Sequence, residues 1–186
     1  MAVMHFLFDT AGRFLVGIFL LRFFMQMVRA NFRNPIAQVV VKFTNPIVMP
    51  LRRVIPGWGG IDNASLVAAL IVQAIIIVLM LLLFGGGSMA TLSITGILFS
   101  TFFSLLLAAI GLYTMLVFLS VLLSWINRDP SNPLAALLHT LTEPLLRPAR
   151  RMIPPIGGFD ISPLVVLLAL QALSILVSQD LLPRLA

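Results

Sequence analysis

Long uncharged apolar segments alternate along the chain with polar segments that contain proline. The clearest apolar segment, residues 64–84, runs for 21 residues without a charge. At about 1.5 Å per helical residue it reaches roughly 30 Å, the thickness of the hydrocarbon core of a bilayer. Residues 97–126 form a second uncharged segment, long enough to cross with a tilt, and residues 161–179 form a third. The pattern predicts three membrane-spanning helices in these segments.

A fourth apolar segment, residues 11–28, is less uniform because it contains Arg13 and Arg22. Asp9 lies four residues before Arg13, so the two side chains can pair on one helix near a membrane face. An arginine inside a span is a functional candidate. Arg22, however, lies two helical turns from Arg29, and we expect it to snorkel toward the membrane interface. With this segment the pattern predicts four transmembrane helices.

Two polar segments, one after the first span and one after the third, each contain a helical pattern of their own. Each pattern begins with Asn-Pro, an N-cap residue followed by proline at the first helical position. Pro46 and Pro144 then interrupt the two patterns. The apolar spacing predicts short amphipathic helices in the interface, with their apolar side in lipid or against the bundle. The apolar residues are Ile36, Val39, Val40, Phe43 and Ile47 in the first, and Leu134, Leu137, Leu138, Leu141 and Leu145 in the second.

The two halves of the chain repeat each other at a spacing of 98 residues. "PLRRVIPGWGGID" begins at Pro50, and "PARRMIPPIGGFD" begins at Pro148. Chance similarity between apolar helices would match leucines and valines, whereas this match preserves prolines, glycines and charges. The shared residues of the first copy are Asn34, Pro35, Thr44, Pro46, Pro50, Arg52, Arg53, Ile55, Pro56, Gly59, Gly60, Asp62 and Gln73.

These patterns together predict an all-α membrane protein. Each repeat has two spans, an even number, so both copies enter the membrane in the same orientation. The four transmembrane helices then form two parallel-repeat helical hairpins, each with a short interfacial amphipathic helix in its long loop. The first repeat covers residues 11–84, a Gly-rich linker covers residues 85–96, and the second repeat covers residues 97–179.

Composition supports a lipid environment. Hydrophobic residues make up 60% of the chain and charged residues 10%, whereas a soluble domain carries roughly a quarter charged residues. The net charge of +6 indicates membrane topology before it indicates nucleic-acid binding, because basic residues do not alternate with aromatic ones in any polar stretch. The absence of cysteine excludes disulfides, thiolate nucleophiles and cysteine-based metal sites.

The basic residues predict how the chain is oriented. The two long loops hold nine of them, the connection at residues 85–96 has none, and the C-terminal tail has Arg184. Because basic loops remain cytoplasmic, we expect both long loops in the cytoplasm and both termini on the opposite side. The nine residues are Arg29, Arg33, Lys42, Arg52, Arg53, Arg128, Arg147, Arg150 and Arg151.

The duplicated motif allows two interpretations. In the first, its arginines anchor the loops to the anionic leaflet, its glycines permit a sharp turn, and its aspartates favour a helix start. In the second, the same residues form a polar surface for a lipid head group, an ion or a protein partner. Gln73 and Gln171 are equivalent in the repeat and are candidates for a polar contact between helices. The candidate motif residues are Arg52, Arg53, Gly59, Gly60, Asp62, Arg150, Arg151, Gly157, Gly158 and Asp160.

Enzymatic motifs are missing from the sequence. The two histidines, His5 and His139, each lack a second ligand at metal spacing, and no phosphate-binding loop or nucleophile elbow is present. We therefore expect no enzymatic activity, no cofactor and no metal.

The duplicated Arg-Arg, Gly-Gly and Asp pattern, together with "LLRFFMQ" at residues 20–26, resembles the YggT family of small bacterial inner-membrane proteins. The resemblance covers nearly the whole chain, and that family is related to the YlmG proteins. It implies a non-enzymatic, multi-pass inner-membrane protein, variously connected with osmotic-stress tolerance and potassium uptake, cell-division or nucleoid organisation, and cytochrome assembly.

Two functions remain open at the level of sequence. One is a scaffold or assembly factor for membrane components, which binds anionic lipid head groups and an unidentified membrane-protein partner and is open to self-association. The alternative is an ion transporter or channel component, with potassium as the candidate ion. Transport usually requires polar groups near the midplane, and here these are few.

Overall fold

The computed structural model describes residues 2–55, 57, 62–85, 93–126, 132–153 and 160–181. All regular structure in these residues is helical. Four helices are long and apolar enough to cross a membrane: α1 (Ala2–Met27), α3 (Asn63–Phe84), α4 (Ile94–Ile126) and the segment Ser162–Gln179. That last segment is α6 (Ser162–Ile175), which continues into a π-helical stretch, η1 (Leu176–Leu181).

The first span begins earlier than the sequence indicates. We predicted its start at residue 11, whereas α1 begins at Ala2. Asp9 and Arg13 lie within the helix, and Arg13 Nε donates to Asp9 Oδ2 at 2.8 Å, which confirms the predicted pair. Opposite charges one turn apart stabilise a helix, so α1 runs through both charged residues.

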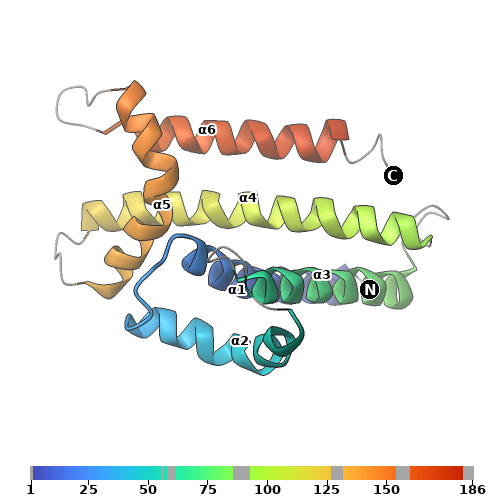
Figure 1. The fold of residues 1–186 in the computed structure, drawn as a ribbon. Coiled ribbons are helices and arrows are strands. Elements are labelled where there is room, and N and C mark those ends of the chain that lie inside the picture. The colour runs from blue at the N-terminus through green and yellow to red at the C-terminus, as the bar shows by residue number, and fades with distance from the viewer. Residues whose placement is uncertain are drawn as a thin grey trace.

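The long helices lie side by side, with the start of α1 and the end of η1 at the same end of the bundle (Figure 1). Helix α1 packs on α3, α4 packs on α6, and α3 and α1 both contact α4. Small residues allow the closest approach: Ala64, Ala68 and Ala69 of α3 are fully buried. A Cβ added at Gly12 of α1 would lie 3.0 Å from Ile76 of α3, so the helix backbones are close.

Two shorter helices, α2 (Pro35–Val54) and α5 (Pro133–Met152), lie toward the end of the bundle opposite the start of α1 and the end of η1 (Figure 1). Asn34 and Asn132 cap them, each side chain accepting a hydrogen bond from a backbone N–H of the first turn. Each helix has two internal prolines, on exposed positions.

We predicted that Pro46 and Pro144 interrupt the two short helices, and this was wrong. Both helices continue through them into the Arg-Arg pair of the motif. Proline costs a helix one hydrogen bond, and on an exposed face the freed carbonyl can be satisfied from outside the helix. The arginines therefore occupy the last helical turn, where the helix dipole favours positive charge.

The predicted apolar face is buried to a different extent in the two short helices. In α5, Leu137, Leu138 and Leu141 of the predicted stripe are buried against the bundle. In α2, Phe43 is 70% exposed and Val39 is 53% exposed, and the buried stripe is shifted to Ala37, Val40, Thr44 and Val48.

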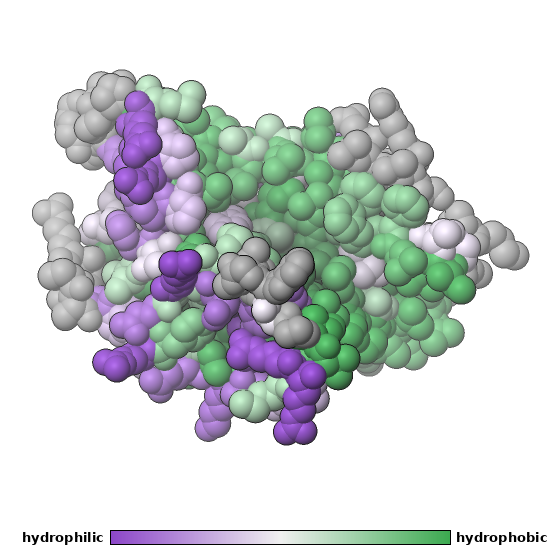
Figure 2. Space-filling model, in the orientation of Figure 1, coloured by the Kyte–Doolittle hydropathy of each residue, from purple (hydrophilic) through white to green (hydrophobic). Residues whose placement is uncertain are grey.

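Hydrophilic and hydrophobic residues separate on the surface (Figure 2). Hydrophilic side chains gather over α2 and α5, whereas the opposite end of the bundle is largely hydrophobic in this view. An apolar band beside a charged end is the surface of a protein that lies in a bilayer.

Candidate functional site

The two copies of the motif form equivalent ion pairs. Arg52 binds Asp62 through two hydrogen bonds, from Nε to Oδ1 at 3.2 Å and from Nη2 to Oδ2 at 2.6 Å. Arg150 Nε donates to Asp160 Oδ2 at 2.8 Å. Each pair connects the last turn of a short helix to the start of the following span, so it fixes the point where the chain re-enters the bundle.

Both aspartates are held in their charged form. Burial raises the pKa of Asp62, but hydrogen bonds from Arg52 and Ser65 outweigh this and hold the pKa below its ordinary value. Burial also raises the pKa of Asp160, and there hydrogen bonds from Arg150 and Ser162 have the same net effect. Both motif aspartates are therefore acceptors that stay ionised at neutral pH.

Arg22 belongs to the same cluster, and our expectation that it snorkels to the interface was wrong. The residue is only 3% exposed. Its Nη1 donates to Thr44 Oγ1 at 2.6 Å and to Asn45 Oδ1 at 2.9 Å, and its Nε lies 3.8 Å from Asp62 Oδ2. Helix α2 packs over this part of α1 and supplies those acceptors, so the guanidinium has partners within the protein and has no need to reach water.

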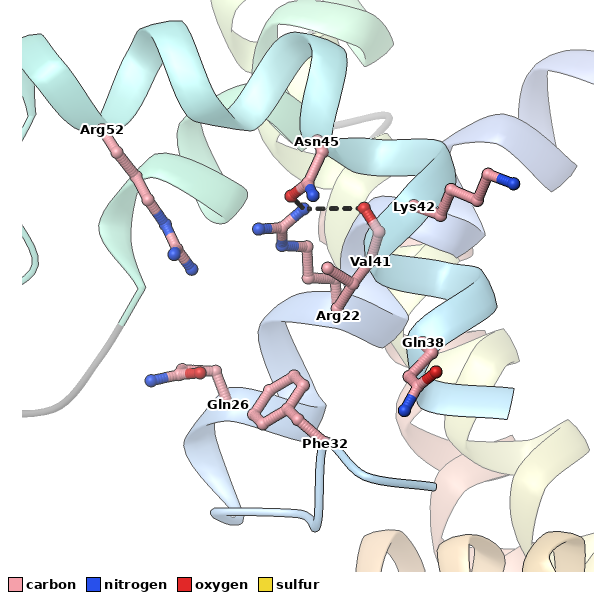
Figure 3. Close-up of a pocket in the computed structure, with 8 residues that line it drawn as sticks. All are labelled: Arg22, Gln26, Phe32, Gln38, Val41, Lys42, Asn45 and Arg52. Carbon is pink, nitrogen blue, oxygen red and sulfur yellow. Dashed lines mark hydrogen bonds between the residues drawn. The ribbon is translucent and has the colours of Figure 1, made fainter. Parts of the chain in front are cut away.

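A cavity of about 440 Å³ opens beside this cluster, between α1, the start of α2 and Arg52 (Figure 3). Arg22 and Arg52 point toward the same open space, whereas the ammonium of Lys42 points away from it (Figure 3). Three basic and three carboxamide side chains line the cavity, and no acidic side chain is among its lining residues. Its lining residues are Arg22, Gln26, Phe32, Gln38, Val41, Lys42, Asn45 and Arg52.

The second repeat is arranged differently around its arginine. Arg150 Nη1 also donates to Glu143 Oε2 at 2.9 Å, so this arginine bridges two carboxylates. His139 Nε2 lies 3.5 Å from the same Glu143. The positive charge of Arg150 is therefore fully compensated by neighbouring acids.

The remaining predicted residues do not join these clusters. Arg53 and Arg151 are exposed, and no ion pair reaches them from the described residues. Gln73 lines a separate, mainly apolar cavity of about 1,120 Å³, while Gln171 is exposed on α6, and no hydrogen bond joins the two. The four motif glycines, Gly59, Gly60, Gly157 and Gly158, lie outside the described residues.

Sequence reasoning missed two features of this site. It treated the arginines and aspartates of the motif separately, although Arg52–Asp62 and Arg150–Asp160 share one spacing of ten residues in both copies, which indicates pairing. It also missed that Arg22 binds α2. Within the described residues, no three His, Asp or Glu side chains are grouped to hold a metal ion.

The fold, with four candidate spans and a charged end, is that of a multi-helix membrane protein. The CCB3/YggT family model matches residues 1–83 and 99–181, and the chain belongs to this family. An uncharacterized protein of Pseudomonas aeruginosa is 42% identical over 95% of this chain and 88% of its own length. The uncharacterized protein YggT of Escherichia coli K12 is 38% identical over 96% of this chain and 91% of its own length. No solved structure matches the chain.

Proposed function

We propose that this protein is a non-enzymatic scaffold or assembly factor of the bacterial inner membrane. It would hold other membrane components through the charged end formed by α2 and α5, in support of envelope or osmotic-stress homeostasis. The observation that carries this proposal is the distribution of charge: α3, α4 and α6 contain none, while exposed arginines and lysine concentrate on the two short helices (Figure 2).

The proposal includes the arrangement in the membrane. The long loops lie in the cytoplasm and both termini in the periplasm, because basic residues concentrate in the loops. The chain is two copies of one unit, each a helical hairpin with an interfacial amphipathic helix. In support, α2 and α5 begin and end at positions 98 residues apart, and each carries the arginine of its Arg–Asp pair in its last turn. Exposed apolar residues of α2 such as Phe43 would then enter the lipid beside the bundle.

Cross-linking in living cells tests the scaffold. A photo-cross-linking amino acid at Met49 of α2 or Met152 of α5 probes the charged end, where both residues are exposed. The same amino acid at Phe102, exposed on the apolar surface of α4, is the matched control. We expect defined protein adducts from Met49 and Met152 that are weakened by Arg53→Gln with Arg151→Gln, and lipid adducts from Phe102. Identical adduct patterns at all three positions would contradict a partner surface on α2 and α5.

Ion transport is the second candidate, supported by the position of Gln73 beside the large cavity. We expect it to fail, because an ion in a mainly apolar passage would lose its hydration without gaining ligands. Purified protein in liposomes should give no potassium flux above that of empty vesicles. Flux that disappears on changing Gln73 and Gln171 to leucine would replace the scaffold by a transporter.

A further inference from the structure

We propose that the cavity between α1 and α2 is a binding site for a phosphate anion. The phosphate would belong to an anionic phospholipid head group or be free in solution. The inference rests on the proposed membrane-organising function and deepens it by naming a ligand for Arg52 of the motif together with Arg22, which lies outside the motif. The argument comes from charge balance, available donors and a comparison of the two repeats.

The charge balance of the cavity is positive. Arg22 and Arg52 approach the same oxygen of Asp62, at 3.8 Å and 2.6 Å, so two guanidinium groups share one carboxylate. One positive charge is left over: Arg22 and Asp62 are buried, whereas the side chain of Arg52 is 46% exposed and points toward the cavity (Figure 3). A phosphodiester carries the single negative charge that would neutralise this excess, and its oxygens can accept hydrogen bonds from both guanidinium groups. Lys42 also lines the cavity, but its ammonium points away from the open space, so the excess charge there is that of Arg22 and Arg52 (Figure 3).

Donors remain free to bind that anion. Arg22 uses Nη1 and Nε for its protein contacts, and its Nη2 has no partner among the described residues. Arg52 binds Asp62 through Nε and Nη2, which leaves its Nη1. Both side chains point into one open space, and the amide of Gln26 lies at its edge (Figure 3). Guanidinium groups fit phosphate oxygens in both geometry and charge.

The second repeat has the same short helix and Arg–Asp pair but lacks the excess positive charge. The residue equivalent to Arg52 is Arg150, and two carboxylates already neutralise it, from Asp160 and Glu143. The excess positive charge is therefore a property of the first repeat and is not required to build the unit. At the spacing of 98 residues, Arg22, Gln26, Lys42 and Asn45 correspond to Ser120, Ser124, Thr140 and Glu143.

This difference supplies a variant that keeps the fold and removes the site. Asn45→Glu copies the second repeat and places a carboxylate where Arg22 now donates to an amide oxygen, so folding is preserved while the excess charge is cancelled. Gln26→Glu adds a carboxylate on the α1 side of the cavity and is an independent second variant. Arg53→Gln is the matched control, because it lowers the net charge by the same one unit from an exposed residue that does not line the cavity.

The measurement is native mass spectrometry of the full-length protein with phosphatidylglycerol or phosphatidylcholine, with helical content followed by circular dichroism. We expect selective retention of phosphatidylglycerol, weakened roughly 10-fold by Asn45→Glu and by Gln26→Glu and unchanged by Arg53→Gln. Binding of inorganic phosphate alone, with the same dependence on the variants, would support the site with free phosphate as its ligand. Phosphatidylglycerol binding that inorganic phosphate does not displace would identify the lipid head group.

Two results would overturn the inference: no preference between the two lipids together with no phosphate binding, or equal losses in all three variants. Equal losses would mean that overall charge, and not this cavity, attracts the anion. The outcome is independent of the cross-linking experiment. Lipid binding without protein adducts would support the phosphate site and contradict the scaffold proposal. Protein adducts without lipid or phosphate binding would contradict only the phosphate site.

Discussion

At the scale of single residues, Arg22 shows where sequence reasoning reached its limit. Its place inside an apolar segment was visible in the sequence, and so was the cost of burying a charge there. The sequence could not show that α2 packs over this turn of α1 and brings Thr44 and Asn45 to the guanidinium. Side chains that are 22 and 23 residues away along the chain complete the site. Such contacts depend on helix packing, which local patterns do not specify.

The hydroxyl of Thr44 should therefore contribute more to stability than that of its repeat equivalent, Thr142. Both residues are buried and both donate to a backbone carbonyl of the preceding turn, but only Thr44 also accepts a hydrogen bond from Arg22. We expect Thr44→Val to leave the buried Arg22 Nη1 without one of its acceptors. The substitution should lower the free energy of unfolding by about 1–3 kcal/mol more than Thr142→Val does. Unfolding of both variants in the same detergent would measure this. Equal costs would show that the bond from Arg22 adds no stability.

The ion pair between Arg52 and Asp62 should make stability depend on pH in acid. The folded state holds the pKa of Asp62 below its ordinary value of 3.8, because hydrogen bonds from Arg52 and Ser65 outweigh burial. The stabilisation is therefore fully present above the unfolded pKa, and it is lost as the pH falls below 3.8 through the lower folded pKa. Thermal unfolding in detergent should show a melting temperature that drops in this range.

Asp62→Asn is the control for the pH dependence, since its amide does not titrate there. This variant should be less stable than the natural protein at neutral pH and should lose less stability on acidification. A melting temperature with the same acid dependence in both proteins would assign the effect to other carboxylates, Asp160 first among them.

At the scale of elements, the sequence predicted which helices form better than it predicted which side of each helix faces the bundle. Hydropathy located the four spans, and the Asn-Pro caps located the starts of α2 and α5. The helix ends were misjudged because proline was taken as a breaker, whereas both helices continue through their internal prolines. Which apolar residues face the bundle could not be deduced, since lipid and protein interior both accept them.

We therefore expect a similar mutation to have a large effect in one short helix and a small effect in the other. Leu141 of α5 is fully buried against the bundle, whereas Phe43 of α2 is 70% exposed. We expect Leu141→Ala to lower the free energy of unfolding in detergent by about 2–5 kcal/mol, because it leaves a cavity. Phe43→Ala should change it by about 0.5 kcal/mol or less, as for other exposed positions. A larger loss from Phe43→Ala than from Leu141→Ala would mean that the faces of these helices are assigned the wrong way round.

At the scale of the whole molecule, the charged end and the apolar band define an axis along the bundle. Helices α2 and α5 lie toward one end of that axis, and the start of α1 and the end of η1 lie at the other (Figure 1). The direction of the axis follows from the charge asymmetry of the loops. Nine basic residues in the two long loops against none in the connection at residues 85–96 favour a cytoplasmic charged end.

Accessibility of single cysteines to a membrane-impermeant thiol reagent in intact cells tests this direction. The chain has no cysteine of its own, so each introduced thiol reports alone. Gln38 and Ala136 are equivalent in the repeat, exposed and uncharged, so replacing them leaves the basic loops unchanged. We expect Gln38→Cys and Ala136→Cys to react only after the cells are opened, and Ser88→Cys in the Gly-rich connection to react in intact cells. Because both repeats must share one orientation, labelling of only one of the first two would contradict the parallel repeat, whereas labelling of both in intact cells would invert the topology.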